Sequence, residues 1–170
     1  MAAVLVHRRR SSLAGRSSGQ RRKLVWASDQ GTFSVPGPNA AHVIDLLVAF
    51  TAAGNLLGTT VMRTHLELAW NPTNVADVLT YGFVVGRVGD LANTTSVAPI
   101  ENKEIDWMLW TASYPSASGA TVDERKIERI DIRSRRKMEE MNQRYLFCVE
   151  HTAATPRTIF WTSRVLVALP

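Results

Sequence analysis

Seven cationic side chains gather near the N-terminus of this 170-residue chain, in a stretch that contains no acid. The stretch reads HRRRSSLAGRSSGQRRKLVW from His7 to Trp26. Guanidinium and ammonium groups neutralise phosphates and release the counterions condensed on a nucleic acid, an interaction that does not depend on base sequence. The candidate nucleic-acid-binding residues are therefore Arg8, Arg9, Arg10, Arg16, Arg21, Arg22 and Lys23.

The positive charge of the chain is confined to this leader. The whole chain has a formal net charge of +5, whereas residues 24–170 hold 13 basic and 15 acidic residues and are slightly negative. Such an asymmetry favours an attached polyanion-binding segment over a basic fold. The leader also has too little apolar surface to offset the cost of ordering it, so we predict that residues 1–23 form a basic arm that is disordered when free.

Two other interpretations of the leader remain open. An N-terminus rich in arginine and serine and poor in acids is also typical of a mitochondrial transit peptide. Between His7 and Lys23, however, only Leu13 and Ala14 interrupt the polar residues, which is too few for a good amphipathic helix. A solvated tail without a partner is the third interpretation.

The rest of the chain offers no arrangement for catalysis or metal binding. The histidines stand far apart, and none has a second ligand at a recognised interval; they are His7, His42, His65 and His151. No phosphate-binding glycine loop, nucleophile elbow or zinc-protease helix occurs. We therefore predict no enzyme activity, no cofactor and no metal, and we interpret Cys148, within YLFCVE, as a small buried hydrophobe.

Charged clusters and aromatic residues in residues 24–170 have simpler interpretations. The acid pairs Asp123–Glu124 and Glu139–Glu140 are expected on solvated or salt-bridged surface. A second basic cluster is expected to be charge-balanced surface, and it would add phosphate contacts if it faced the same side as the arm; its members are Arg133, Arg135, Arg136 and Lys137. The tryptophans are expected to anchor the core or an interface; they are Trp26, Trp70, Trp107, Trp110 and Trp161.

These side chains must be positioned mainly by short strands, because β-branched and aromatic residues alternate with polar ones over several stretches. In residues 59–70 we expect Met62, Thr64, Leu66, Leu68 and Trp70 on the core face. Arg63, His65 and Glu67 are expected on the opposite face. A helix is predicted over residues 40–54 from the spacing of its apolar residues. Strands are predicted over residues 23–28, 29–36, 59–70, 78–89, 105–115, 144–152 and 157–170, the last two separated like the strands of a hairpin.

Residues 122–142 fit two periods. Ile127, Ile130, Ser134, Met138 and Met141 follow helical spacing, whereas Ile130 and Ile132 alternate with charged residues as in a strand. We favour a strand over about residues 126–134 followed by a helical turn through RRKMEEM, and a single long helix is the alternative. The total is about eight antiparallel strands with a short helical insertion, which predicts an all-β sandwich; no apolar run is long enough to span a membrane.

An arginine-rich arm followed by such a sandwich resembles the single jelly-roll coat proteins of small icosahedral viruses. Residues 1–23 would correspond to the genome-facing arm and residues 24–170 to the shell domain. The resemblance implies a capsid subunit, located in the virion, that assembles in many copies into an icosahedral shell and binds the viral genome without sequence preference.

Three alternatives to a coat protein are open. A cellular or organellar nucleic-acid-binding β-barrel with a cleaved targeting segment would carry its binding face on residues 24–170, and the slight negative charge of that region argues against it. A sandwich-fold enzyme or ligand-binding protein lacks a recognisable site. A phage shell-decorating or tail protein would need the arm for another purpose.

Overall fold

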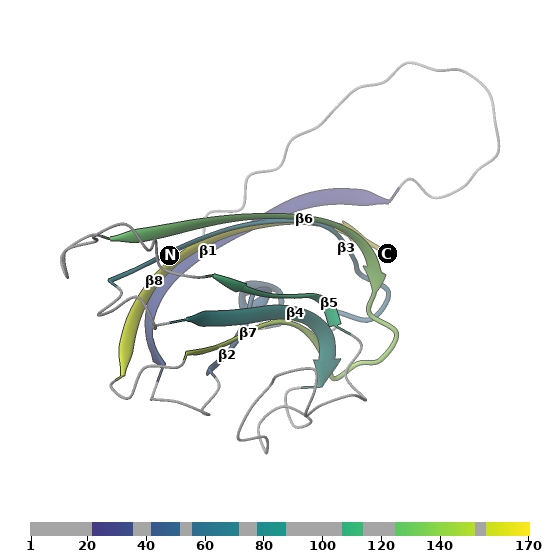
Figure 1. Cartoon of the computed structure of the whole chain (residues 1–170). Helices are drawn as coiled ribbons and strands as arrows, with labels where there is room; N and C mark the ends of the chain where they lie inside the picture. The colour runs from purple at the N-terminus through teal and green to yellow at the C-terminus, as the bar shows by residue number, and fades with distance from the viewer. Residues whose placement is uncertain are drawn as a thin grey trace.

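A computed structural model describes residues 22–35, 42–51, 56–71, 78–87, 107–113, 125–151 and 156–170. Eight strands form two four-stranded sheets that pack face to face (Figure 1). The strands are β1 (Lys23–Val35), β2 (His42–Asp45), β3 (Thr60–Trp70), β4 (Leu79–Arg87), β5 (Trp107–Ser113), β6 (Lys126–Lys137), β7 (Gln143–His151) and β8 (Arg157–Leu169). The one described helix is α1 (Val48–Thr51).

The strand order identifies the sandwich as a jelly roll. The first sheet has the order β1-β8-β3-β6 and the second the order β2-β7-β4-β5, and every pairing is antiparallel. The chain therefore passes repeatedly from one sheet to the other, as in the double Greek-key arrangement of an eight-stranded jelly roll. The predicted all-β sandwich of about eight antiparallel strands is confirmed.

The core lies between the two sheets, and the first sheet contributes alternate residues of its strands. Along β8, the side chains of Ile159, Trp161, Ser163 and Val165 are buried, whereas those of Phe160, Thr162 and Arg164 are exposed. Because successive side chains of a strand point to opposite faces, this alternation gives the first sheet one inner face against the core and one outer face toward solvent.

The two strands predicted over residues 23–28 and 29–36 are one continuous strand, β1 (Lys23–Val35), which pairs with β8 along its whole length. Glycine is tolerated in the middle of this strand because the indole of Trp161 fills the space beside it. A Cβ atom on Gly31 would lie 3.1 Å from Nε1 of that ring. The glycine therefore marks a close approach between the two residues.

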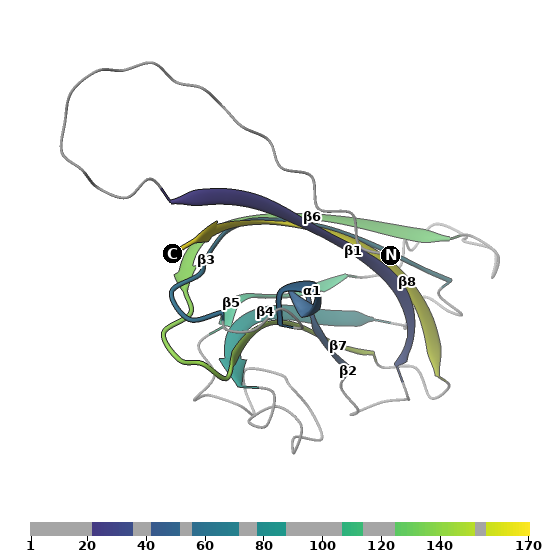
Figure 2. The ribbon, with the colours of Figure 1, turned by 180° about the vertical axis from the view of Figure 1, so that it is seen from behind.

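The prediction of a helix over residues 40–54 is wrong in its first part. His42–Asp45 form β2, which pairs with β7, and the backbone N–H of Leu46 donates to the Tyr145 carbonyl at 2.9 Å. The Asp45 carboxylate then accepts a hydrogen bond from the N–H of Leu47, and only the short α1 follows (Figure 2). Hydrogen bonds to a neighbouring strand replace those of a helix that would be marginal alone. Residues 40–41 and 52–54 lie outside the described residues.

Three further expectations about the strands need correction. Met62 is half-buried while Val61 is fully buried, because the register shifts between Val61 and Arg63; Thr64, Leu66, Leu68 and Trp70 enter the core as expected. The preferred strand in residues 126–134 is confirmed, but it continues to Lys137 and no helical turn follows it. Strands β7 and β8 do not form a hairpin, because they belong to different sheets.

One buried hydrogen bond joins the two sheets through the core. The hydroxyls of Thr64 on β3 and Tyr145 on β7 lie 2.7 Å apart, and both side chains are fully buried. Neither hydroxyl can exchange its partner for bulk water. Removing one of them therefore leaves the other buried and unsatisfied.

We predict that Tyr145→Phe lowers the free energy of unfolding by about 1–3 kcal/mol, because Thr64 loses its partner. The double variant Thr64→Val/Tyr145→Phe should lose less than the sum of the two single variants. Urea unfolding followed by tryptophan fluorescence measures all three values. Strict additivity would show that the two hydroxyls do not depend on each other.

Candidate nucleic-acid interface

Two of the seven predicted arm residues lie within the described part of the chain. The Arg22 guanidinium donates a hydrogen bond to Oγ1 of Thr60 at 3.5 Å, and Lys23 is the first residue of β1, paired with Leu169. The other five lie outside the described residues; they are Arg8, Arg9, Arg10, Arg16 and Arg21. The basic leader thus enters the fold at one end of the first sheet.

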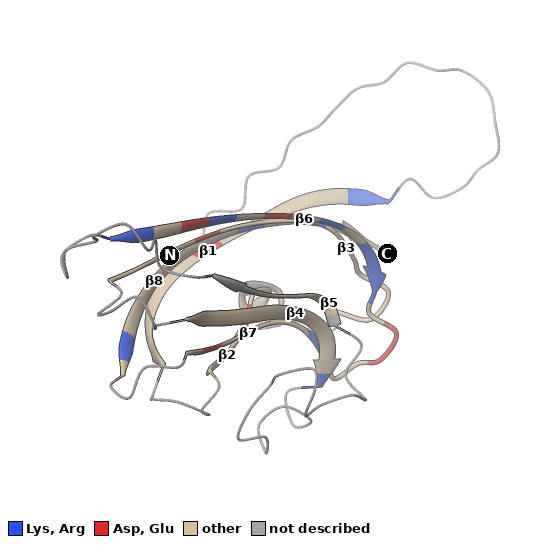
Figure 3. Cartoon of the chain, in the orientation of Figure 1, with Lys and Arg blue, Asp and Glu red and all other residues tan. Residues whose placement is uncertain are grey.

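The second basic cluster ends at the same end of that sheet. Across the strands, Leu24 pairs with Ala168, Ala168 with Thr60, and Thr60 with Lys137. The start of β1 and the end of β6 are consequently level with each other, and both are basic (Figure 3). Sequence alone could not establish this, because about 110 residues separate the two segments along the chain.

The outer face of the first sheet carries more cations than acids. Arg63 of β3, Arg129 and Arg133 of β6 and Arg164 of β8 occupy outward positions, with Arg135 near them; the acids at outward positions are Glu67 and Asp131. The sequence pattern had placed Arg63, His65 and Glu67 outward, and that is confirmed. Arg129 and Arg164 were missed, although alternation along β6 and β8 was a signal that could have found them.

Ion pairs occupy two of these arginines. Arg63 makes a two-pronged contact with Asp131, with Nε at 2.9 Å from Oδ1 and Nη2 at 2.6 Å from Oδ2. The hydrogen bonds from Arg63 lower the pKa of Asp131, and the same bonds to Asp131 raise the pKa of Arg63. Nδ1 of His65 lies 3.5 Å from the same carboxylate, and Arg129 pairs with Glu67 at 2.9 Å.

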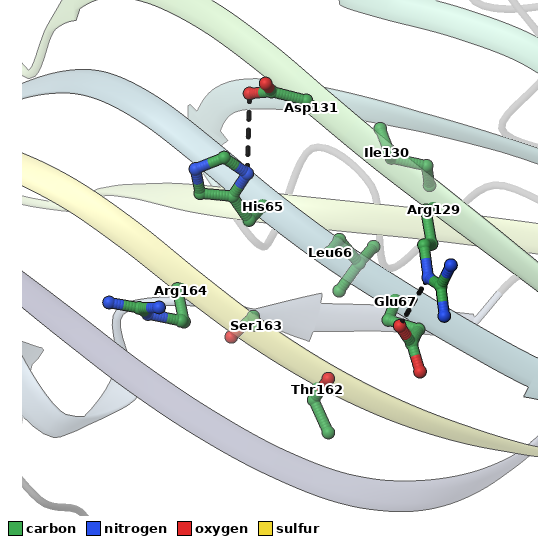
Figure 4. A pocket seen from close by; sticks show the side chains of 9 residues that line it. All are labelled: His65, Leu66, Glu67, Arg129, Ile130, Asp131, Thr162, Ser163 and Arg164. Atoms are coloured by element: carbon green, nitrogen blue, oxygen red, sulfur yellow. Dashed lines mark hydrogen bonds and ion pairs between the residues drawn. The ribbon is translucent and has the colours of Figure 1, made fainter.

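An open hollow lies among these residues on the outer face. Figure 4 shows His65 directed toward Asp131 and Arg129 toward Glu67, with the Arg164 side chain on the opposite side of the hollow. A second open hollow lies nearer to the basic end of the sheet and is lined by Met62, Arg63, Arg133, Ser134, Arg135 and Leu166. Arginines line both hollows, together with the acids Glu67 and Asp131 in the first and the apolar side chains of Met62 and Leu166 in the second.

An aromatic ring adjoins the first hollow. Trp26 of β1 is partly exposed, stacks on His65 with ring centroids 5.7 Å apart, and lies beneath the Arg164 guanidinium, 5.1 Å from its ring centre. Trp70 and Trp161 are buried, as expected of core anchors. The side chains of Trp107 and Trp110 lie outside the described part of the structure. The outer face therefore combines cations with an accessible indole.

The other residues considered for chemistry are separate from one another. His42 stacks on Phe33 at 4.6 Å, and the ring Nε2 of His151 lies 2.9 Å from the Val35 carbonyl oxygen. Glu140 pairs with Arg87, Glu139 is exposed, and the pair Asp123–Glu124 falls outside the described ranges. Within the described residues, no three His, Cys, Asp or Glu side chains are grouped to hold a metal ion, and no helix is long and apolar enough to cross a membrane.

Comparisons with known proteins find similar folds only among solved structures; no family model and no curated protein matches the sequence. The Triatoma virus empty capsid is 10% identical, with a TM-score of 0.47 over 84% of this chain and 90% of that one. The decameric BFDV capsid protein is 10% identical, with a TM-score of 0.43 over 86% and 98%. Desmodium yellow mottle tymovirus is 14% identical, with a TM-score of 0.38 over 95% and 90%. At these identities the likeness concerns the fold.

Cys148 is fully buried, as its apolar sequence neighbours suggested. Burial, and then the nearby Glu150, raises the pKa of its thiol to about 12. Since the thiolate is the reactive form, we predict that the folded protein reacts negligibly with iodoacetamide at about pH 8 and takes up one equivalent in urea. Mass spectrometry counts the adducts. Rapid labelling of the folded protein would contradict this burial.

His42 gives the fold a sensitivity to mild acid. Burial lowers the pKa of His42 below its ordinary value of 6.5, so as the pH falls below about 6.5 the unfolded chain binds this proton before the folded one does. Stability should therefore decrease as the pH falls from 6.5 toward the folded-state pKa. We predict that His42→Phe, which keeps an aromatic ring beside Phe33, shows a smaller decrease in urea midpoint between about pH 7.5 and 5.5. Equal decreases in both proteins would exclude this role.

Proposed function

We propose that this chain is the capsid subunit of a small icosahedral virus, which assembles in many copies into a shell and binds the packaged genome through its arginine-rich N-terminus. The observation that carries the proposal is the pair of strand orders, β1-β8-β3-β6 and β2-β7-β4-β5. This double-sheet jelly roll is an architecture of viral capsid domains. Lectins and cupins share it, so the basic leader that precedes β1 is what favours a capsid over them.

The leader suits a role in genome packaging because its chemistry is general. Seven cations without an acid can neutralise phosphates of any sequence, and the number of counterions they release makes such binding strongly dependent on salt. The residues proposed for this role are Arg8, Arg9, Arg10, Arg16, Arg21, Arg22 and Lys23. Many copies of such a segment would repel one another until a polyanion joined them, which would couple assembly to packaging.

The folded domain suits repetition of one subunit. Residues 24–170 are close to neutral overall, so copies can approach without strong repulsion. Shells are built from many such identical contacts related by symmetry. A structural role of this kind needs no catalytic group, cofactor or resident metal.

The test is expression of the full chain and of a variant, here called the five-serine variant, in which Arg8, Arg9, Arg10, Arg16 and Arg21 are replaced by serine. The wild-type chain should form large particles that carry host nucleic acid, whereas the five-serine variant should carry several-fold less, because its leader keeps only Arg22 and Lys23. Sedimentation measures particle size, and the ratio of absorbance at about 260 and 280 nm measures nucleic-acid content.

A control variant with the same five positions changed to lysine keeps the charge and should package as the wild type does. A wild-type chain that stays a monomer and binds no nucleic acid at low salt would overturn the proposal. Mature protein from its source that begins near Lys23 would instead favour a cleaved targeting segment.

A further inference from the structure

We propose that the outer face of the sheet β1-β8-β3-β6 is a second nucleic-acid-binding surface, so that this face of the sandwich is the one turned toward the genome. The inference rests on the proposed function for the origin of the nucleic acid. It adds a binding site on the folded domain, distinct from the leader, with Arg133 and Arg135 as its main phosphate contacts.

Charge is the first reason. The outer face presents five arginines against two acids, although residues 24–170 as a whole have more acids than bases. The described outward positions of β7, in the other sheet, hold one residue of each sign, Arg144 and Glu150. Compared with β7, the outer face of the first sheet thus carries the larger excess of cations among the described residues, and it would attract a polyanion.

The arrangement of the ion pairs is the second reason. Asp131 is held by both prongs of the Arg63 guanidinium, and Glu67 is held by Arg129. No hydrogen bond or salt bridge links the Arg133 or Arg135 side chain to another described residue, and both are exposed. The acids of this face are hydrogen-bonded to other arginines, and Arg133 acts on Asp131 only through its charge. These two guanidinium groups therefore have no hydrogen-bonded partner among the described residues and can bind phosphate.

The alternation of β6 brings these two arginines together. Arg133 and Arg135 are two residues apart on the strand, so their side chains share the outward face of the sheet. Both line the hollow that Arg63 of β3 also lines, beside the register shift at Met62. Three guanidinium groups therefore surround one open depression.

A stacking platform lies beside the cations. Trp26 is partly exposed, and its indole is oriented by His65 and Arg164. Base–aromatic stacking tolerates any base, so it fits a surface that binds without sequence preference. Trp26 also belongs to the strand that follows the basic leader directly, so a strand of nucleic acid held by Arg22 and Lys23 would continue onto this face.

A second copy of the chain fits this half of the face less well. Two such surfaces would bring arginines against arginines in a symmetric contact. Of the exposed large apolar side chains of the outer face, Phe160 and Ile127 lie next to Ala69 near the opposite end of the sheet, and Leu24 lies at the start of β1. Most of the exposed apolar surface is therefore away from Arg133 and Arg135.

The test uses the five-serine variant, which removes most of the charge of the leader and keeps the full chain. Arg133→Ser and Arg135→Ser are added to it together, and the probe is a fluorescent single-stranded RNA of mixed sequence. We expect the five-serine variant to bind this RNA weakly at low salt, and the two added changes to raise its Kd by about tenfold and to reduce the salt slope by about 1–1.5.

The matched control replaces Arg125 and Lys126, at the other end of β6, by serine in the same background. It removes the same charge and should change the Kd by less than about twofold. Equal effects of the two double variants, or no RNA binding by the five-serine variant, would overturn the inference. Unfolding midpoints within a few degrees of each other would show that all the variants are folded.

Particle formation separates this inference from the proposed function. Wild-type particles that carry nucleic acid, together with an outer face that binds none, would leave the proposed function standing and refute the second surface. A wild-type chain that neither assembles nor packages nucleic acid would refute the proposed function, whatever the RNA titration shows. Loss of assembly without loss of RNA binding in the Arg133/Arg135 variant would identify the face as a contact between subunits and refute the inference.

Discussion

Antiparallel pairing of β3 and β8 at the centre of the first sheet determines which side chains enter the core and which face solvent. Their register places Leu66, Leu68 and Trp161 inside and Arg63, His65 and Arg164 outside. A slip of one residue would turn over the strand that slips, so it would bury Arg63 and His65 if β3 moved, or Arg164 if β8 moved. The apolar core and the cationic outer face are therefore two consequences of one register, and neither can be altered without the other.

Sequence patterns predicted the fold where alternation was strong and where one face had to be apolar. Strand β3 alternates from Arg63 to Trp70, and its residues lie as the pattern requires. The pattern wrongly predicted a helix at β2. Val43, Leu46 and Leu47 have helical spacing, but this spacing does not come from a helix. Val43 belongs to a strand, and the two leucines are buried in the turn after it. Pairing with β7, more than 100 residues away in the chain, overrides the local preference, and a local pattern contains no information about that partner.

The candidate interface was predictable in composition but not in arrangement. The sequence shows two basic segments, one with Arg22 and Lys23 and one ending at Lys137. Their common position depends on Thr60 of β3, which pairs with Lys137 of β6 and with Ala168 of β8, and Ala168 pairs in turn with Leu24 of β1. Arg164 is a single cation within an apolar strand, so its place over Trp26 could be seen only after the sheet order was known. Charge runs reveal a leader easily, whereas a surface assembled from one residue per strand needs the topology.

The distribution of charge also constrains how copies of the domain can pack. Because residues 24–170 are slightly negative while the outer face of the first sheet is positive, the other residues of the domain must hold the excess of acid. In a closed shell of the proposed kind, the cationic face would be turned inward to the polyanion, and contacts between subunits would involve other surfaces. Genome binding would then lower the repulsion on the inner side without affecting those contacts. The salt dependence of packaging and that of subunit contacts would therefore differ, although both depend on the same subunit.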